Sequence, residues 1–490
     1  MDERRLAGVD RRVDRRVDLG TAGVLIASSA VLHFVLLRSA GPFWRDEINS
    51  IRLAGSPTLQ QFLRDLPFDS APFLGFALLR GWLATVGGEA LRWAGLLIGL
   101  GLLGMLCARR RFPLIALALI GTSGAIIRYG DSVRPYGLAM IAAVAAYLAL
   151  ERKSWGIALL ACAVAIHISF HNAVIVFAVC VAAATARKSI VPLLIGAASA
   201  LTLLIYVPTI RVAQQFSALT RYEVDALWVW RKFEEAMAMS GPFALRIFLA
   251  LFFVAVVFYT SNAYAANTLL VLTISYAAFL MKLSYLMQPW YFVVYVAVAA
   301  LSIDDLLTPV LRKASKFPIA AVVAIVIAAA AYPAALAVTK QRSTNMDIVG
   351  AAAGRDLVIV YPWYLGVSFS AYYKGTAPWQ TMPPLPDHHL HRYDLARAAS
   401  EDLRSGDELI SRAASVLAGG GTVWVAGFPL HEESAAYVAK PERATGIAAA
   451  DLRWSNQLAA VLKTAREQVV VAPDPKVAGH ERVMLVAFRQ

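Results

Sequence analysis

Two adjacent acids, Asp46 and Glu47, follow Trp44 and Arg45 shortly after the first apolar run of the chain. Acids in the first turn of a helix commonly satisfy free backbone N–H groups and the helix dipole, so an isolated pair is most simply a helix cap. A carboxylate in a partly desolvated cleft can instead act as a general base. The pair is therefore a candidate for such a base as well as for a cap.

A second set of ionisable residues, Arg128, Asp131, Arg134 and Tyr136, lies in the segment IIRYGDSVRPYG between two apolar runs. Charges near a bilayer are costly unless they are used. Two neighbouring arginines suit a phosphate group, which accepts bidentate N–H donors. The alternative is a set of snorkelling arginines paired with Asp131.

A third set, in the segment 282–291, combines Lys282 with Ser284, Tyr285, Trp290 and Tyr291. A lysine at the end of a span usually snorkels and aromatic residues usually anchor the helix, so this set is informative only beside the other two.

Histidines raise the question of a metal site. His167 and His171 are four positions apart and could share a helix face, but no acid stands near them in the sequence, which favours buried, hydrogen-bonded histidines. The segment from Asp387 to His391 has a spacing closer to that of a metal site. It lies in a proline-rich loop, however, where histidines are mostly solvated. We assign no metal ligands.

The composition indicates a membrane protein. Apolar residues make up 59% of the chain, charged residues 16%, and the mean hydropathy is +0.59. The net charge of +13 does not point to nucleic acid, because the basic residues stand between apolar runs, as in short cytoplasmic loops. The three cysteines lie inside apolar stretches without metal-ligand spacing.

A transmembrane helix needs about 20 apolar residues, and on that basis the chain has about eleven spans. The first is too long for a signal-peptide core and has no cleavage site after it, so we interpret it as a retained anchor. The predicted spans are 20–37, 91–108, 113–129, 136–150, 155–169, 172–186, 190–207, 243–260, 266–285, 289–303 and 317–336.

Basic residues orient these spans. With the N-terminal tail 1–19 in the cytoplasm, the basic clusters at 109–111, 151–153, 187–188 and 312–316 all fall on the cytoplasmic side. The segment 337–490 is then extracytoplasmic, as are the three sets of candidate residues. We predict a multi-pass protein of a bacterial inner membrane.

The extracytoplasmic segments carry further predictions. In the loop 38–90, the stretches 58–66 and 73–86 are expected to be helices in the plane of the interface. The alternative, a true span at 73–86, would place the basic cluster 109–111 outside the cytoplasm. In 337–490, strands at 356–361, 422–425, 468–471 and 483–488 alternate with helices at 400–417 and 447–464. This pattern predicts a small α/β domain with a mostly parallel sheet, in which the glycines at 419–421 end a helix.

The order of these features resembles the GT-C glycosyltransferases, specifically the polyprenyl-phosphate-sugar-dependent group that includes protein mannosyltransferases and lipid A aminoarabinose transferases. The resemblance covers about 40–305. It is carried, in order, by WRDE at 44–47, DSAPFLGFALL at 69–79, LRWAGLLIGLGLLGMLCARRRF at 91–112, GDSVRPYGL at 130–138, FHNAVIVF at 170–177 and MQPWYFVVYVAVAAL at 287–301.

This sequence departs from the family's motifs at three places. The departures bear on the sugar and the phosphate site rather than on the class of enzyme. Ser132 stands where the family has Glu, Ser70-Ala71-Pro72 stands for the common His-Pro-Pro, and Trp290 replaces the usual Arg.

The resemblance implies a polytopic α-helical membrane glycosyltransferase that transfers a sugar, with inversion, from a polyprenyl-phosphate donor to an acceptor hydroxyl. Asp46 would be the general base, with Glu47 beside it. Arg128, Arg134 and Lys282 would bind the donor phosphate. The remaining substrate contacts would come from Trp44, Asp131, Tyr136, His171, Trp290 and Tyr291.

The expected partners are the lipid-linked donor, membrane lipids and a glycan, glycolipid or protein acceptor, with no nucleic acid. Some members of the family use a divalent cation, and the sequence leaves that cofactor open. A polymerase or ligase of lipid-linked glycans is an alternative, although such enzymes rely on arginine and histidine in a late loop. A transporter or flippase would show internal repeats and midplane charges, and the sequence shows no such repeat.

Overall fold

The computed structural model describes residues 3–69, 71–109, 111–217, 224–283, 287–314, 318–402, 404–430 and 447–490. Features predicted at Ser70, Arg110, Ser284, Tyr285 and Lys316 lie outside these ranges. The chain divides into two compact units. The helical unit comprises Met1–Ser39, Ala71–Val207 and Tyr222–Lys340, and the α/β unit comprises Ala40–Ser70, Pro208–Arg221 and Gln341–Gln490.

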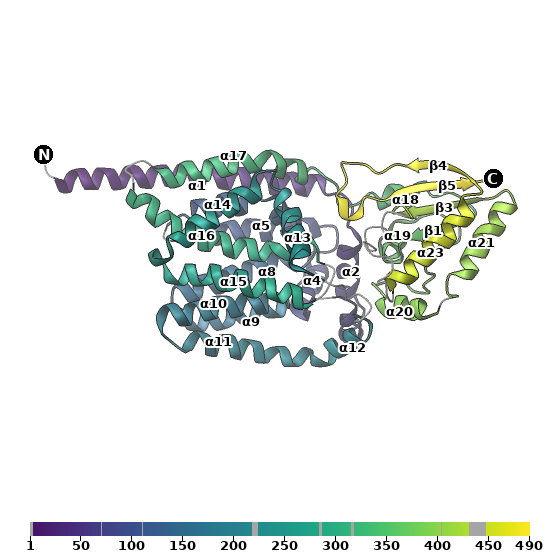
Figure 1. Cartoon of the computed structure of the whole chain (residues 1–490), viewed down its shortest axis with the longest axis horizontal. Helices are drawn as coiled ribbons and strands as arrows, with labels where there is room; N and C mark the ends of the chain where they lie inside the picture. Colours follow the sequence, from purple (N-terminus) through teal and green to yellow (C-terminus); the bar gives the residue numbers. More distant parts are fainter. Residues whose placement is uncertain are drawn as a thin grey trace. The chain divides into compact units, whose positions relative to one another are not determined.

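The helical unit is built from apolar helices joined by short connections (Figure 1). Its helices are α1 (Glu3–Ser39), α4 (Phe73–Thr85), α5 (Leu91–Cys107), α6 (Leu114–Gly121), α7 (Gly124–Gly130), α8 (Tyr136–Glu151), α9 (Trp155–Ile168), α10 (Asn172–Arg187), α11 (Val191–Leu201), α13 (Ala226–Ala238), α14 (Ala244–Val257), α15 (Ala263–Leu283), α16 (Val293–Ala314) and α17 (Ile319–Thr339). Along the chain, α11 is followed by a 3-10 turn at Thr202–Tyr206 and by helix α12 (Val207–Ser217), which belongs to the α/β unit except for its first residue.

Within the described residues, five helices are long and apolar enough to cross a membrane: Arg16–Ser39, Val191–Phe216, Ala263–Leu283, Pro289–Ala314 and Ile319–Thr339. Shorter apolar helices accompany them. Large apolar side chains such as Leu160 and Leu204 are exposed on these helices, as expected where lipid is the solvent. The chain is a multi-pass membrane protein.

Over the described residues, each predicted span coincides with helical segments, but 113–129 is divided into two separate helices. These helices, α6 and α7, are separated at Thr122 and Ser123. The Ser123 hydroxyl accepts a hydrogen bond from the Ile126 N–H at 3.3 Å and so begins a new helix. Apolarity alone does not reveal this break, because apolar residues continue on both sides of it.

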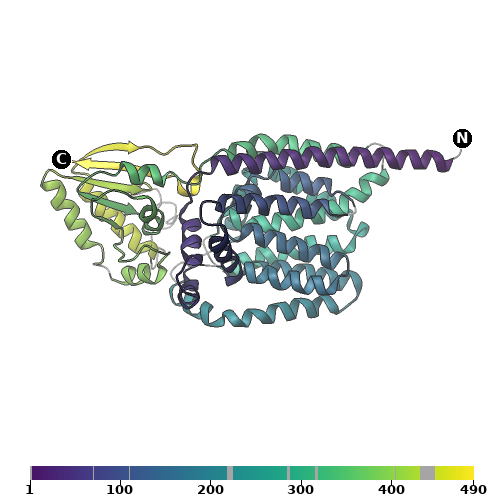
Figure 2. The same cartoon turned by 180° about the vertical axis from the view of Figure 1, so that it is seen from behind.

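Long helices define the packing of this unit. Helix α16 is buried along most of its length against α6, α8 and α15. Helices α1 and α17 lie side by side along one edge, as Figures 1 and 2 both show. The core of the unit is therefore helix against helix, with small residues where helices approach closely.

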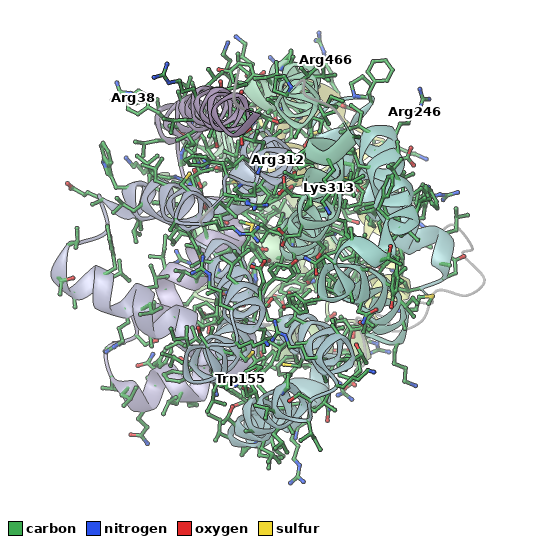
Figure 3. All side chains as sticks on the ribbon, turned by 90° about the vertical axis from the view of Figure 1, so that its left-hand side faces the viewer. Arg38, Trp155, Arg246, Arg312, Lys313 and Arg466 are labelled. Carbon is green, nitrogen blue, oxygen red and sulfur yellow. The ribbon has the colours of Figure 1, made fainter. Side chains whose placement is uncertain are left out.

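Predicted cytoplasmic charges meet at one end of the helical unit. Arg109 Nη2 donates to Glu151 at 2.9 Å and to Asp305 at 2.8 Å, and Arg187 Nη2 donates to the carbonyl of Glu151 at 2.8 Å. Figure 3 looks along the helices and shows Arg312 within the outline of the bundle, where it pairs with Asp18 at 2.5 Å. The basic residues among them come from different parts of the chain. Their position at one end of the helical unit supports the prediction that they lie on the same side of the membrane.

The α/β unit contains α2 (Arg45–Ala54), α3 (Leu59–Asp65), α18 (Met346–Ala352), α19 (Gly366–Tyr372), α20 (Tyr393–Glu401), α21 (Asp407–Ala418) and α23 (Ile447–Leu462). Its strands are β1 (Leu357–Tyr361), β2 (Trp379–Thr381), β3 (Thr422–Gly427), β4 (Arg466–Val471) and β5 (Met484–Arg489). The four predicted strands and the helix at 447–464 are confirmed, and β2 was not predicted. The apolar run at 468–471 favours a buried strand, but β4 is exposed along most of its length. The helix predicted at 400–417 begins at Asp407, after α20 has ended.

The strand order is β2-β1-β3-β5-β4. The prediction of a mostly parallel sheet is wrong, because only the pairs of β1 with β2 and β3 are parallel among the described strands. Strand β5 pairs antiparallel with both β3 and β4. Strands β4 and β5 follow each other without an intervening α-helix, so the chain reverses direction between them.

Both faces of the sheet are covered. Side chains of β1 alternate, so that Leu357, Ile359 and Tyr361 pack with α21 and α23, and Val358 and Val360 pack with α18 and α19. Figure 1 shows α21 and α23 laid across the sheet. Helix α21 ends at Ala418, and Gly420 adopts φ +74°, which confirms the predicted helix stop at 419–421.

The stretches 58–66 and 73–86 are helical, as predicted, in α3 and α4. The Thr58 hydroxyl accepts the Gln61 N–H at 3.1 Å and starts α3. Their location at a membrane interface stays a prediction.

Candidate functional site

The first candidate residues start helix α2. Trp44 precedes the helix and is buried, and its N–H donates to Glu47 Oε2 at 3.2 Å. Glu47 is fully buried at the third helical position, where an acid reaching back to the preceding backbone is half of a capping box. Its geometry is therefore that of a capping residue.

A second carboxyl caps the same helix from far along the chain. The Arg45 N–H donates to Glu481 Oε2 at 2.6 Å, and Arg45 Nη1 donates to the carbonyl of His480 at 2.8 Å. The Arg45 guanidinium lies 4.6 Å from the ring centre of Tyr364. Burial raises the pKa of Glu481 to about 7, against the opposing effect of Arg45.

Asp46 differs from its two neighbours. Its side chain is 18% exposed, and its carboxylate lies 3.5 Å from Arg45 Nε. Glu47 and Glu481 accept the N–H groups of Trp44 and Arg45, so other acids satisfy these two donors at the start of α2. Asp46 is the acid of this cluster that combines solvent access with a cationic neighbour.

The other end of α2 anchors the histidine loop. Arg52 Nη1 donates to the carbonyls of His388 at 2.9 Å and His389 at 3.2 Å, and the His391 N–H donates to Asn49 Oδ1 at 2.8 Å. Burial lowers the pKa of His388 to about 4, so this imidazole is neutral at pH 7. The loop is packed through its backbone rather than arranged around an ion.

No group of three or more His, Cys, Asp or Glu side chains within the described ranges could hold a metal ion. At the start of α2, Glu47 and Glu481 accept backbone N–H groups, and Asp46 lies 3.5 Å from Arg45 Nε. They do not fit the divalent cation that the family resemblance leaves open.

In the helical unit, the second candidate set forms the turn between α7 and α8. Asp131 Oδ2 lies 2.7 Å from His33 Nδ1 of α1, and both side chains are buried. Two glycines of α5 allow this approach. A Cβ on Gly95 would lie 2.0 Å from the Asp131 carbonyl oxygen, and one on Gly99 would lie 2.4 Å from His33 Cε1.

The same turn borders a cavity of about 410 Å³. Its lining comes from α4, α5 and the segment Ser132 to Ile141, and it is mostly apolar. Ser132, Arg134 and Trp82 supply the polar side chains, and the Trp82 indole N–H is buried without a hydrogen-bond partner among the described residues. An apolar cavity with a few polar groups is the usual form of a small-molecule or lipid site.

The remaining candidates are distributed around this end of the helices. The Arg134 guanidinium lies 5.7 Å from the Tyr136 ring centre. Arg128 is buried in the last turn of α7 but does not line the cavity. Lys282 is exposed in the last turn of α15. The structure thus separates Arg134, which borders a cavity, from the other two cations predicted to bind phosphate.

Aromatic candidates pair with one another. Trp290 meets Tyr129 edge to face with ring centres 5.3 Å apart, and Tyr291 stacks on His171 at 4.6 Å. Nε2 of His171 is buried without a hydrogen-bond partner in the part of the chain that the structure describes. His167 bonds separately to Tyr206 and Thr202 at 2.8 Å, so the two histidines do not share a site.

Sequence reasoning missed Glu481, His33 and Trp82. His33 is a lone histidine inside the first apolar run, which could have marked it as an ionisable residue in a membrane segment. Glu481 carries no local signal, because its role depends on residues at the start of α2.

Comparison with known proteins gives one kind of match. No protein-family model and no curated protein matches the chain. Its structure is similar to the crystal structure of ArnT from Cupriavidus metallidurans bound to undecaprenyl phosphate, at 13% identity and a TM-score of 0.48. The alignment covers 96% of this chain and 98% of that chain.

Proposed function

We propose that this protein is a membrane glycosyltransferase that takes a sugar from a polyprenyl-phosphate donor and transfers it, with inversion, to an acceptor hydroxyl on the extracytoplasmic side of a bacterial inner membrane. The cavity bordered by Arg134 carries the proposal. It combines an apolar lining, which suits an isoprenoid chain, with a guanidinium, which suits a phosphate. The ordered sequence motifs, from WRDE at 44–47 to the segment 287–301, support the same class.

The reaction would be a single displacement. The acceptor oxygen attacks C1 of the sugar while the bond from C1 to the phosphate oxygen breaks. The acceptor proton passes to the Asp46 carboxylate, and the polyprenyl phosphate leaves with one more negative charge than the donor carried. A single displacement at C1 inverts its configuration.

Two residues have separate tasks in this scheme. Asp46, with its solvent access, accepts the proton as general base. Arg134 stabilises the charge that develops on the phosphate, which lowers the barrier because that charge is largest in the transition state. Glu47 holds the start of α2 and does not exchange a proton with substrate.

The test uses purified protein in lipid nanodiscs with radiolabelled polyprenyl-phosphate sugars, and measures the release of polyprenyl phosphate. We expect Asp46→Asn to lose about 10²–10⁴-fold in rate and to bind undecaprenyl phosphate as the wild type does. Asp407→Asn is the matched control, because Asp407 is an exposed aspartate in the first turn of α21.

Two results would contradict the proposal. Full activity of Asp46→Asn would remove Asp46 as the base. A wild-type protein that moves the lipid-linked sugar across the bilayer without releasing lipid phosphate would instead be a flippase.

A further inference from the structure

The segment that leads into helix α2 is held by residues near the end of the chain, all within the α/β unit. The Ser343 N–H donates to the Ala40 carbonyl at 2.7 Å, and the Tyr372 hydroxyl donates to the Phe43 carbonyl at 2.9 Å. The Trp44 ring packs edge to face on His480, with ring centres 4.3 Å apart. The path of the backbone before Asp46 is therefore set by the C-terminal part of the chain.

Glu481 makes the last of these contacts, immediately before Asp46. It lies in a 3-10 turn at Gly479–Glu481, is fully buried, and accepts the Arg45 N–H at 2.6 Å. The first N–H groups of a helix have no partner within the helix, and a carboxylate there is favoured by the helix dipole. A hydrogen bond to a charged acceptor is also roughly twice as strong as a neutral one.

We propose that Glu481 is a positioning residue for Asp46. By accepting the amide of the residue before Asp46, it fixes the first turn of α2 and with it the direction in which the Asp46 carboxylate is presented. This inference rests on the proposed function, in which Asp46 is the general base.

The surroundings of Glu481 make its charge sensitive to pH. Arg45 and Asp46 face it from α2, Ser368 from α19, and His480 and Arg482 flank it in its own segment. Burial raises the pKa of Glu481 to about 7, and Asp46 adds to the rise while Arg45 and Ser368 oppose it. Glu481 therefore loses its charge as the pH falls through about 7, and its hold on the Arg45 N–H weakens.

The experiment compares Glu481→Leu, which removes the acceptor, with Glu481→Gln, which keeps an acceptor oxygen but cannot ionise. Glu467→Leu is the control, because Glu467 is an exposed acid of the same unit. Transfer kinetics from about pH 5.5 to about pH 8.5 and amide hydrogen exchange of the peptide 44–50 are measured in all four proteins.

We expect Glu481→Leu to lower kcat about tenfold or more, with KM for the donor unchanged, and to speed amide exchange in 44–50. Wild-type kcat should fall as the pH drops through about 7. Glu481→Gln, which resembles the protonated acid, should lack this limb, with kcat near the low-pH value of the wild type and amide exchange between those of the wild type and Glu481→Leu. Glu467→Leu should match the wild type in every measurement.

The proposal is overturned if a folded Glu481→Leu keeps wild-type kcat, if its amide exchange is unchanged, or if Glu481→Gln keeps the limb near pH 7. The exchange measurement also separates the two proposals. A wild-type protein without any transfer would refute the proposed function, and exchange in Glu481→Leu would still decide whether Glu481 holds the start of α2.

Discussion

The two ends of the helical unit both bury arginine, but they do so in different ways. Where α8 ends, Arg109 is held between Glu151 and Asp305, and the Tyr147 hydroxyl donates to Asp305 at 2.8 Å. Where α8 begins, Arg134 borders a mostly apolar cavity of about 410 Å³.

The contrast separates a charge held between carboxylates from a charge beside an apolar cavity. A buried arginine with two carboxylates at hydrogen-bond distance joins α5, α8 and α16, and it has little capacity left to bind anything else. An arginine beside an apolar cavity can meet an anion that enters with an apolar chain. Burial alone would not tell these two ends apart.

The largest expected effect is on stability at the Arg109 end. Arg109→Met removes the cation and leaves the partly buried carboxyls of Glu151 and Asp305 beside each other without it, so we expect a loss of about 3–5 kcal/mol of unfolding free energy. Denaturant unfolding in detergent measures it. Arg152→Met, an exposed arginine at the same end, should change stability by less than about 0.5 kcal/mol. Equal stability of the two variants would show that the Arg109 network is not structural.

The next largest effect is on catalysis at the Arg134 end. Arg134→Gln should lower kcat about 10²–10³-fold, because the leaving phosphate loses its cationic partner in the transition state. Arg134→Lys should recover part of this loss, since it restores the charge without the bidentate geometry. Steady-state transfer rates measure both variants.

Arg128→Gln sharpens this test, because Arg128 is equally buried but does not line the cavity. If Arg128→Gln lost as much activity as Arg134→Gln, the cavity would not be what distinguishes the two arginines.

The smallest effect is expected from filling the cavity. Leu138→Trp adds bulk to the cavity lining and should weaken binding of undecaprenyl phosphate about tenfold, or about 1.4 kcal/mol. Leu160→Trp, on an exposed face of α9, is the matched control and should leave binding unchanged. Undiminished lipid binding by Leu138→Trp would place the isoprenoid chain elsewhere.

Much of the fold could be predicted from sequence, because it depends on properties of short continuous stretches, such as apolar length. Apolar length predicted the helices of the membrane unit, and short β-branched runs predicted β1, β3, β4 and β5. Strand β2 was missed because it has only three residues, Trp379–Thr381, and lies at the edge of the sheet, where β1 is its one partner among the described strands. The break at Thr122 and Ser123 was missed because a hydroxyl cap does not alter hydropathy.

The candidate site likewise has features that the sequence predicts and features that only the tertiary structure shows. Sequence alone determined the types and order of Asp46, Glu47, Arg128 and Arg134, because motif order and composition are properties of the chain itself. That these residues serve a lipid-phosphate sugar stays a prediction. Only tertiary structure could decide which of them caps a helix and which borders a cavity. Glu481, 436 positions from Arg45, fills a capping position beside Asp46, and an apolar cavity sets Arg134 apart from Arg128. Hydrogen-bond partners and cavities are made by residues distant in sequence, so no local pattern contains them.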